Sequence, residues 1–362
     1  MLQKEIQREY YNKFVELVVE IAKWLGMYNS LPAIWWFIIA SIVAALFFFF
    51  IIAVFALIAI YVERKVSGHV QDRLGPMETG WHGILQTLAD TIKLFLKEDI
   101  IPAAVDRKLF ILAPVIVFMT SLAVFVVFPF SEKFVVTELN IGILYVVAIS
   151  TVVVPGIIMA GWSSNNKWSL FGAMRSAAQI VSYEIPVGLS IVCAVMAAGD
   201  LSMQGIVVKQ AGGFWNWFIF SNPFTFVAFF IYFLASLAEV NRMPFDIPEA
   251  ESELVAGYMT EYSGIRWAFF FLAEYGNMLA VSIIAVTLFL GGWQAPFPAL
   301  EFIPGWLWFL CKTLFLVFVQ IWMRWTLPRL RVDQLMYICW KVLTPFAFVC
   351  IFGGGLWQVL IK

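Results

Sequence analysis

"IWWFIIASIVAALFFFFIIAVFALIAIY", residues 34–61, decides the fold, because it is long, apolar and free of charged side chains. A helix needs about 20 apolar residues to cross a bilayer. Seven further segments qualify, at 108–129, 141–161, 177–199, 223–239, 265–291, 305–326 and 336–358. Backbone groups cannot stay unpaired in hydrocarbon, and the alternation typical of barrel strands is absent. We therefore predict an all-α integral membrane protein with about eight transmembrane helices.

The composition supports a membrane protein and excludes several other classes. The chain is 62% hydrophobic and 13% charged, whereas soluble proteins are about 45–50% apolar and about 25% charged. No run of basic residues suggests nucleic-acid binding, and no dinucleotide or P-loop motif is present. The cysteines lie in apolar runs without metal-ligand spacing, at Cys193, Cys311, Cys339 and Cys350. We therefore expect this chain to bind no metal and no redox cofactor.

The distribution of Lys and Arg predicts the organisation and orientation. Residues 1–33 form an N-terminal amphipathic segment that we expect on the bilayer surface, and residues 34–358 form one polytopic domain. Four connections carry 14 Lys and Arg residues, namely 62–108, 162–176, 240–266 and 324–335. The positive-inside rule places these connections in the cytoplasm and both termini on the opposite side. The four basic residues before residue 34 oppose this orientation, but the later loops agree with it.

The first of these connections contains a second amphipathic segment, GWHGILQTLADTIKLFLKED, residues 80–99. One side is apolar: Trp81, Ile84, Leu85, Leu88, Ile92 and Phe95. The other side is polar: His82, Gln86, Asp90, Lys93 and Lys97. Both sets step by three or four residues, which predicts a helix too short and too charged to span. We expect it at the membrane interface or against neighbouring helices. No sustained internal repeat is seen, which argues against an inverted-repeat transporter.

Carboxylates gather in the stretch AEVNRMPFDIPEAESELVAGYMTEY, residues 238–262, where Arg242 is the one basic residue. They are Glu239, Asp246, Glu249, Glu251, Glu253 and Glu261. A solvated polar loop is the ordinary interpretation of such a segment. Here, however, the acids alternate with apolar residues, which predicts a packed segment. Glu249 and Glu253 would also repel each other on one helix face.

Two more acids, Glu184 and Glu274, lie within predicted spans. Carboxylates in a membrane are functional candidates, although each alone is as well explained by a helix–helix hydrogen bond. Taken with the acidic stretch, they favour a proton relay, but the spacing does not reveal which acids approach one another. Cations at the same ends could be topological anchors, could neutralise the acids, or could bind the polar head of a ligand: Arg64, Lys65, Arg73, Arg175, Arg324, Arg329 and Arg331.

Several ordered motifs resemble one protein family. They are ERKVSGHVQDRLGP, GILQTLADTIKLFLKEDIIP, GAMRSAAQIVSYEIP, the acidic stretch, FLAEYGNM and RWTLPRLRVDQLMYICWK. Together they resemble the quinone-site membrane subunit of respiratory complex I, the H-type subunit of NADH:quinone oxidoreductase, over residues 34–358. The N-terminal extension fits less well and favours a bacterial source. Thr87 stands where relatives often have Pro.

The resemblance implies a subunit of a proton-pumping NADH:quinone oxidoreductase in the bacterial inner membrane, inactive alone. Quinone is the implied substrate, with FMN and iron–sulfur clusters in partner subunits. Those partners include hydrophilic iron–sulfur and quinone-site subunits, and small and antiporter-like membrane subunits. The implied chamber residues are Glu63, Arg64, Arg73, Trp81, Leu85, Asp90 and Phe245, supported by Arg175 and Arg324. The implied relay residues are Glu184, Glu239, Asp246, Glu249, Glu251, Glu253, Glu261 and Glu274.

Two other functions stay open at this point. A related subunit of a membrane-bound hydrogenase or formate-hydrogen lyase would keep the acids without needing a quinone site, although the intact first connection favours quinone. A stand-alone secondary transporter would be active without partners, and the lack of repeats argues against it.

A quinone has an apolar tail and a head with two carbonyl acceptors, which suits an amphipathic helix next to Arg donors.

Overall fold

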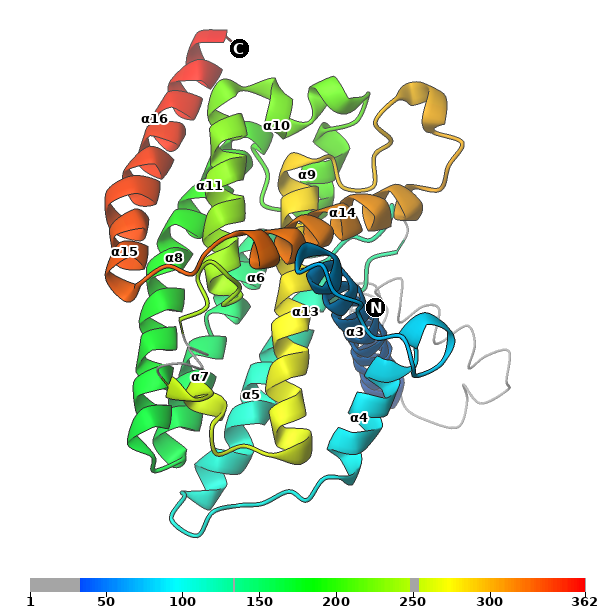
Figure 1. Cartoon of the computed structure of the whole chain (residues 1–362). Helices are drawn as coiled ribbons and strands as arrows, with labels where there is room; N and C mark the ends of the chain where they lie inside the picture. The colour runs from blue at the N-terminus through cyan, green and yellow to red at the C-terminus, as the bar shows by residue number, and fades with distance from the viewer. Residues whose placement is uncertain (1–32, 133, 248–253, 362) are drawn as a thin grey trace.

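The computed structural model describes residues 33–132, 134–247 and 254–361, so the predicted N-terminal amphipathic segment lies almost wholly outside the described residues. The α-helices (Figure 1) are α3 (Ala33–Val70), α4 (Gln86–Leu96), α5 (Arg107–Val124), α6 (Gly142–Ser150), α7 (Val153–Ser163), α8 (Lys167–Ala198), α9 (Met203–Lys209), α10 (Phe218–Ser221), α11 (Pro223–Glu239), α13 (Gly264–Phe289), α14 (Gly305–Thr326), α15 (Val332–Tyr337) and α16 (Thr344–Ile361).

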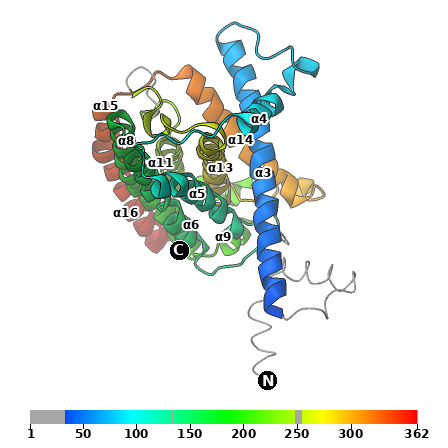
Figure 2. The same ribbon diagram turned by 90° about the horizontal axis from the view of Figure 1, so that it is seen from below.

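Two groups of packed helices form the bundle. Helix α8 packs against α7, α11 and α16, while α13 packs against α5, α3, α14 and α11. Figure 1 shows α5, α8, α11 and α13 along their lengths and α3 foreshortened. Figure 2 shows α3 along its length and the other four helices nearly end-on. Helix α3 therefore crosses the others steeply. Its 38 residues make it about 57 Å long, far more than the ~30 Å hydrocarbon core of a bilayer.

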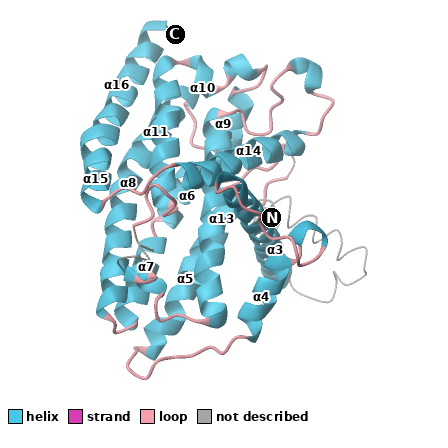
Figure 3. Ribbon diagram, in the orientation of Figure 1, coloured by secondary structure: helices cyan, strands magenta, loops and turns pink. Residues whose placement is uncertain are grey.

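The prediction of an all-helical membrane protein is confirmed, since every regular element in the described ranges is a helix (Figure 3). Seven helical stretches among the described residues are long and apolar enough to span, and α11 is a shorter apolar helix. The predicted count of eight thus depends on α11, which has 17 residues. The predicted span 141–161 is made of two helices, α6 and α7, separated at residues 151–152.

Two helices extend beyond the limits that hydropathy predicts. Helix α3 continues from residue 61 to Val70, and α8 begins at Lys167 instead of residue 177. The added turns contain polar residues, so hydropathy does not predict them as part of a span. The backbone hydrogen bonds of each helix nevertheless continue through these turns. These turns carry Glu63 and Arg175, two of the predicted site residues.

The amphipathic helix α4 is shorter than predicted. Its apolar face points outward, whereas an amphipathic helix of a soluble protein turns its apolar face toward the core. Helix α4 begins at Gln86, because Gly80, His82 and Gly83 adopt positive φ angles of 76°, 53° and 79° that interrupt a helix. Its Asp90 contacts Arg64 of α3. Its apolar residues point outward, with exposed fractions of 51% at Leu85 and 66% at Phe95. The outward face is therefore available to lipid or to another subunit.

A half-buried ammonium joins α14 to the segment that follows α13, at the end of the bundle opposite α4. Lys312 on α14 donates to the carbonyl oxygens of Leu290, Gly292 and Gln294, at 2.8, 3.0 and 2.8 Å. Its Nζ also lies 4.0 Å from the ring centroid of Trp217. The three carbonyls follow the last turn of α13, where a cation is stabilised by the helix dipole.

Candidate functional site

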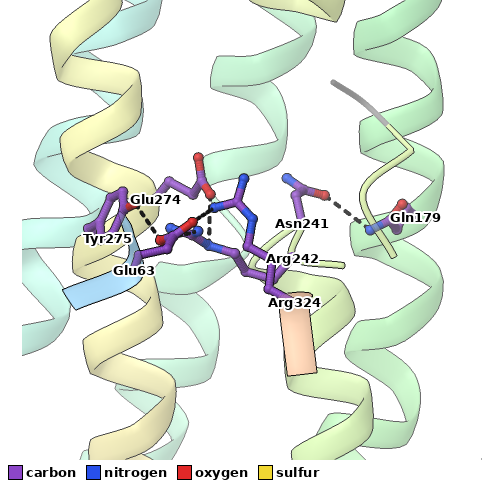
Figure 4. A network of polar contacts seen from close by, with 7 residues as sticks. All are labelled: Glu63, Gln179, Asn241, Arg242, Glu274, Tyr275 and Arg324. Carbon is purple, nitrogen blue, oxygen red and sulfur yellow. Dashed lines mark hydrogen bonds and ion pairs between the residues drawn. The ribbon is translucent and has the colours of Figure 1, made fainter. Parts of the chain in front are cut away.

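A buried carboxylate, Glu63, lies at the centre of a charge network (Figure 4). Its Oε2 accepts a hydrogen bond of 2.7 Å from the Tyr275 hydroxyl and one of 3.1 Å from Nη1 of Arg242. Its Oε1 accepts from Nη1 of Arg324. Glu63 is 6% exposed. Three separate parts of the chain therefore hold one carboxylate in place at the end of α3.

Arg242 connects this carboxylate to a second one. Its Nε lies 2.9 Å from Oε1 of Glu274, but the N–H is not aligned for a hydrogen bond, so the contact is an ion pair. The guanidinium also lies 4.4 Å from the ring centroid of Tyr275. Burial alone would lower the pKa of Arg242, but the Glu274 and Glu63 carboxylates raise it well above its usual value, so Arg242 stays charged.

The network contains two carboxylates and two guanidiniums, so its formal charge is zero. Arg242 is 2% exposed and Glu274 13%, whereas Arg324 is 22% exposed. Buried charges are tolerated when they are paired and hydrogen-bonded in this way. Any added or removed charge in this poorly solvated place would have to be balanced nearby.

The turn that ends α11 aims Arg242 into the network. Asn241 adopts a left-handed φ of 55°, and the backbone N–H of Arg242 donates to the Leu237 carbonyl at 3.1 Å. This arrangement ends a helix and reverses the chain, and Asn tolerates the left-handed position better than most residues. The Leu330 N–H then donates to the Pro244 carbonyl at 3.0 Å, so the turn is also tied to the segment after α14.

A second group of acids lines a cavity between α8, α11 and α13. Glu184, Glu239, Tyr232 and Asn277 contribute to a cavity of about 50 Å³. Glu184 and Glu239 are close enough to interact electrostatically. The cavity has room for water and offers polar partners to hold it, so a hydrogen-bonded chain can form between the acids.

Helix α13 contributes to both groups. Glu274 belongs to the charge network and Asn277 to the cavity. Residues three apart are neighbours on a helix face. The network and the cavity are therefore one helical turn apart along α13.

Polar contacts also fasten α4 to α3. Nη1 of Arg64 lies 2.5 Å from Oδ2 of Asp90, whose Oδ1 accepts from Gln86 at 2.9 Å. The Gln86 side-chain oxygen accepts from Thr79 at 2.6 Å, and the Tyr61 hydroxyl donates to the His82 carbonyl at 3.0 Å. Arg64 and Asp90 are 44% and 31% exposed at their side chains, so this tie is accessible to water.

Comparison with known proteins assigns the chain to a family. A family profile described as NADH dehydrogenase matches residues 9–353. The H subunit of NADH-quinone oxidoreductase from Chlorobaculum tepidum is 55% identical over 321 residues, covering 85% of this chain and 89% of the relative. An H subunit of the same enzyme from Geobacter sulfurreducens is 46% identical over 329 residues, covering 84% and 92%. The chain belongs to the family of NADH-quinone oxidoreductase H subunits.

The fold of this H-type subunit brings some of the predicted site residues together. Glu63 and Arg324 are in direct contact, Arg64 contacts Asp90, and Glu184 approaches Glu239. Asp246 is close enough to Glu274 to interact with it electrostatically. Glu249, Glu251 and Glu253 lie outside the described residues.

Other predicted residues of this H-type subunit lie apart from the network. Phe245 is 3% exposed and packs on Tyr183, with ring centroids 5.4 Å apart. The Glu261 carboxylate accepts a 2.6 Å hydrogen bond from Asn166, which caps the start of α8. Arg175 is half-buried, 4.3 Å from the Phe171 ring centroid. Arg73, Trp81 and Leu85 are exposed.

Sequence reasoning missed several polar residues of the site in this H-type subunit. Asn277 follows Glu274 by three residues within FLAEYGNM, and a signal existed there, because residues three apart in a helix share a face. Tyr275 is adjacent to Glu274 and gives no such signal. Tyr232 lies in a span without a nearby charge and gives no such signal, whereas Gln179 follows Arg175 by four residues, a spacing that sequence reasoning did not use. The sequence marks Arg242 only as the one cation of the acidic stretch.

Proposed function

We propose that this chain is the membrane subunit of a proton-pumping NADH:quinone oxidoreductase that forms part of the quinone chamber and carries the proton relay. The observation that carries the proposal is the pairing of Glu63 and Glu274 with Arg242 and Arg324, one helical turn from an acidic cavity. The relatives are H subunits of NADH-quinone oxidoreductases, which favours this function over the hydrogenase and transporter alternatives.

The chamber is proposed on the α3–α4 side of the network. Arg324 is the most exposed member of the network, and Arg64 with Asp90 lies nearby on the same end of α3. An apolar tail would lie along outward residues of α4, and the carbonyls of the head would meet guanidinium donors. The proposed chamber residues are Glu63, Arg64, Arg73, Trp81, Leu85, Asp90 and Phe245, with Arg175 and Arg324 as supports.

The coupling step follows from charge balance. A quinone takes up two electrons from an iron–sulfur cluster of a partner subunit and two protons, giving a quinol. Negative charge on the head during reduction attracts Arg324 and weakens its hold on Glu63. A carboxylate that loses a paired cation in a low-dielectric site binds a proton more readily. Protons then pass by way of Glu274 to Glu239 and Glu184 through water in the cavity.

The remaining acids and the wider setting complete the proposal. Asp246, Glu249, Glu251, Glu253 and Glu261 are proposed to supply protons from the same side. The relatives and the apolar helices indicate a multi-pass membrane protein. We propose that residues 34–358 act as one domain in the bacterial inner membrane, with the basic connections cytoplasmic and both termini periplasmic. FMN and iron–sulfur clusters are assigned to partner subunits, so the chain alone is inert.

The test replaces relay acids in the assembled complex. Glu239→Gln and Glu274→Gln should each lower quinone reduction and proton translocation by at least about tenfold, because loss of a proton-transfer group costs that much or more. Reduction of ferricyanide by NADH should stay unchanged, since it needs only partner cofactors. Glu301→Gln, at an exposed site on the far end of the bundle, is the matched control. Equal loss of both activities would indicate an assembly defect instead. Wild-type quinone reduction and proton translocation in both variants would contradict the relay.

A further inference from the structure

One buried amide contacts both sides of the turn that carries Glu239 and Arg242. Gln179 lies on α8 and is 2% exposed. Its Nε2 donates to the carbonyl oxygen of Phe245 at 2.7 Å and to that of Ala238 at 2.8 Å, and lies 3.1 Å from Oδ1 of Asn241 (Figure 4). An amide nitrogen has two N–H groups, so the three acceptors share them.

The orientation of this amide follows from its partners. All three neighbours of Nε2 are oxygen atoms that accept hydrogen bonds. A flipped amide would place its own oxygen against them and leave both N–H groups elsewhere, which is unfavourable. The donor side of Gln179 therefore faces the turn.

The three acceptors bracket the functional residues of the turn. Ala238 directly precedes Glu239, while Asn241 and Phe245 lie on either side of Arg242. Gln179 itself stands on the same helix as Glu184, which lies little more than one turn further on. One side chain thus links the helix that bears one cavity acid to the turn that bears the other acid and the central guanidinium.

We propose that Gln179 is a positioning residue of the relay, which fixes Glu239 against Glu184 and Arg242 against Glu63 and Glu274. This inference rests on the proposed function of those residues. Gln179 transfers no proton and touches no reacting atom. It acts by fixing the turn. Without it, the carbonyls of Ala238 and Phe245 would keep only donors from the turn itself, the N–H groups of Asn241 and Ile247, and none of the described hydrogen bonds would join the turn to α8 at this place.

A second buried glutamine offers a matched comparison. Gln320 on α14 is 1% exposed and donates from Nε2 to the Ser282 hydroxyl at 3.1 Å. It joins two helices as Gln179 joins a helix to a turn, but none of its described hydrogen bonds involves the turn 238–245. A role limited to helix packing predicts similar effects of replacing either glutamine.

The test compares Gln179→Met with Gln320→Met in the assembled complex, both of which keep length and remove the amide. Gln179→Met should lower kcat for quinone reduction about tenfold, corresponding to one or two lost buried hydrogen bonds. The KM for quinone should stay within about twofold, because Gln179 contacts only the backbone carbonyl of Phe245 and makes none of the described contacts to Arg64 or Arg324. Gln320→Met should keep wild-type kcat per assembled complex, counted by NADH–ferricyanide activity. Equal kcat values for the two variants would overturn the proposal.

Two milder variants keep the test decisive if Gln179→Met does not assemble. Gln179→Asn keeps the amide but is one methylene too short to reach all acceptors, and it should show the same loss of kcat at unchanged KM. Asn241→Gly keeps the left-handed turn and removes one acceptor, so its effect should be smaller. A wild-type kcat in Gln179→Asn would refute the inference. Wild-type activity in Glu239→Gln and Glu274→Gln would instead refute the proposed function beneath it.

Discussion

Glu63 illustrates what single residues reveal only once the chain has folded. Its partners are Tyr275, Arg242 and Arg324, which lie up to 261 positions away in the sequence. The sequence marks each of the charged residues as unusual, because charge near a span is costly. It does not reveal their pairing, since helix spacing relates neighbours within one helix and not side chains on different helices.

Balance of charge in this network leads to a prediction about Arg242. Arg242→Met should reduce the amount of assembled complex, because leaving a buried carboxylate unpaired costs ~3–5 kcal/mol. Arg242→Met combined with Glu274→Gln removes one charge of each sign and should recover much of the assembly without recovering quinone reduction. Native-gel electrophoresis measures the first effect, and turnover per complex measures the second. If the double variant assembles no better than Arg242→Met, charge balance is not what stabilises the network.

Helix α4 shows how an element can be predicted correctly while its first residue is not. Its amphipathic period is evident in the sequence, and a helix is indeed present. The sequence predicts its start too early, because the glycine turn at 80–83 interrupts the periodic pattern. The direction of its faces could not be predicted, because that depends on Arg64 of another helix attracting Asp90.

We expect the contact between Arg64 of α3 and Asp90 of α4 to affect the KM for quinone. Arg64→Met should raise the KM for short-chain quinones, because α4 loses its charged contact and Arg64 is a chamber candidate. If the contact carries the effect, Arg64→Met with Asp90→Asn should be no worse than Arg64→Met alone. Lys93→Met is the control, since Lys93 is 74% exposed and lies 3.9 Å from the same carboxylate. Additive changes in KM would mean that Arg64 and Asp90 act independently.

For the molecule as a whole, composition was sufficient to predict a helical membrane bundle, whereas the steep crossing of α3 was not predictable. Crossing angles arise from side chains packed between helices. Gly161 is an example, because a Cβ there would come within 2.3 Å of the Ala173 Cβ, so α7 and α8 need this close approach. Hydropathy depends on the length and polarity of a segment, and neither property determines which faces of two helices pack together.

The proposed orientation can be tested on intact cells and inverted vesicles. Cysteines are introduced singly at Glu78 or Glu301, both exposed, after the exposed Cys311 is replaced by Ser. Glu78 lies in the basic connection 62–108, and Glu301 lies in the connection between the predicted spans 265–291 and 305–326. A membrane-impermeant maleimide should label Glu78→Cys only in inverted vesicles and Glu301→Cys only in cells, because the basic connections are assigned to the cytoplasm. The opposite pattern would reverse the assignment of both ends.

The ammonium of Lys312 has a mechanical consequence for the charge network. Lys312 and Arg324 stand on the same helix about 18 Å apart along its axis, and each is bonded to another part of the bundle. Sliding of α14 along α13 would break all three carbonyl contacts at once, so their register is fixed. A change at Glu63 would therefore pass more readily through Arg242 into the turn after α11 than along α14.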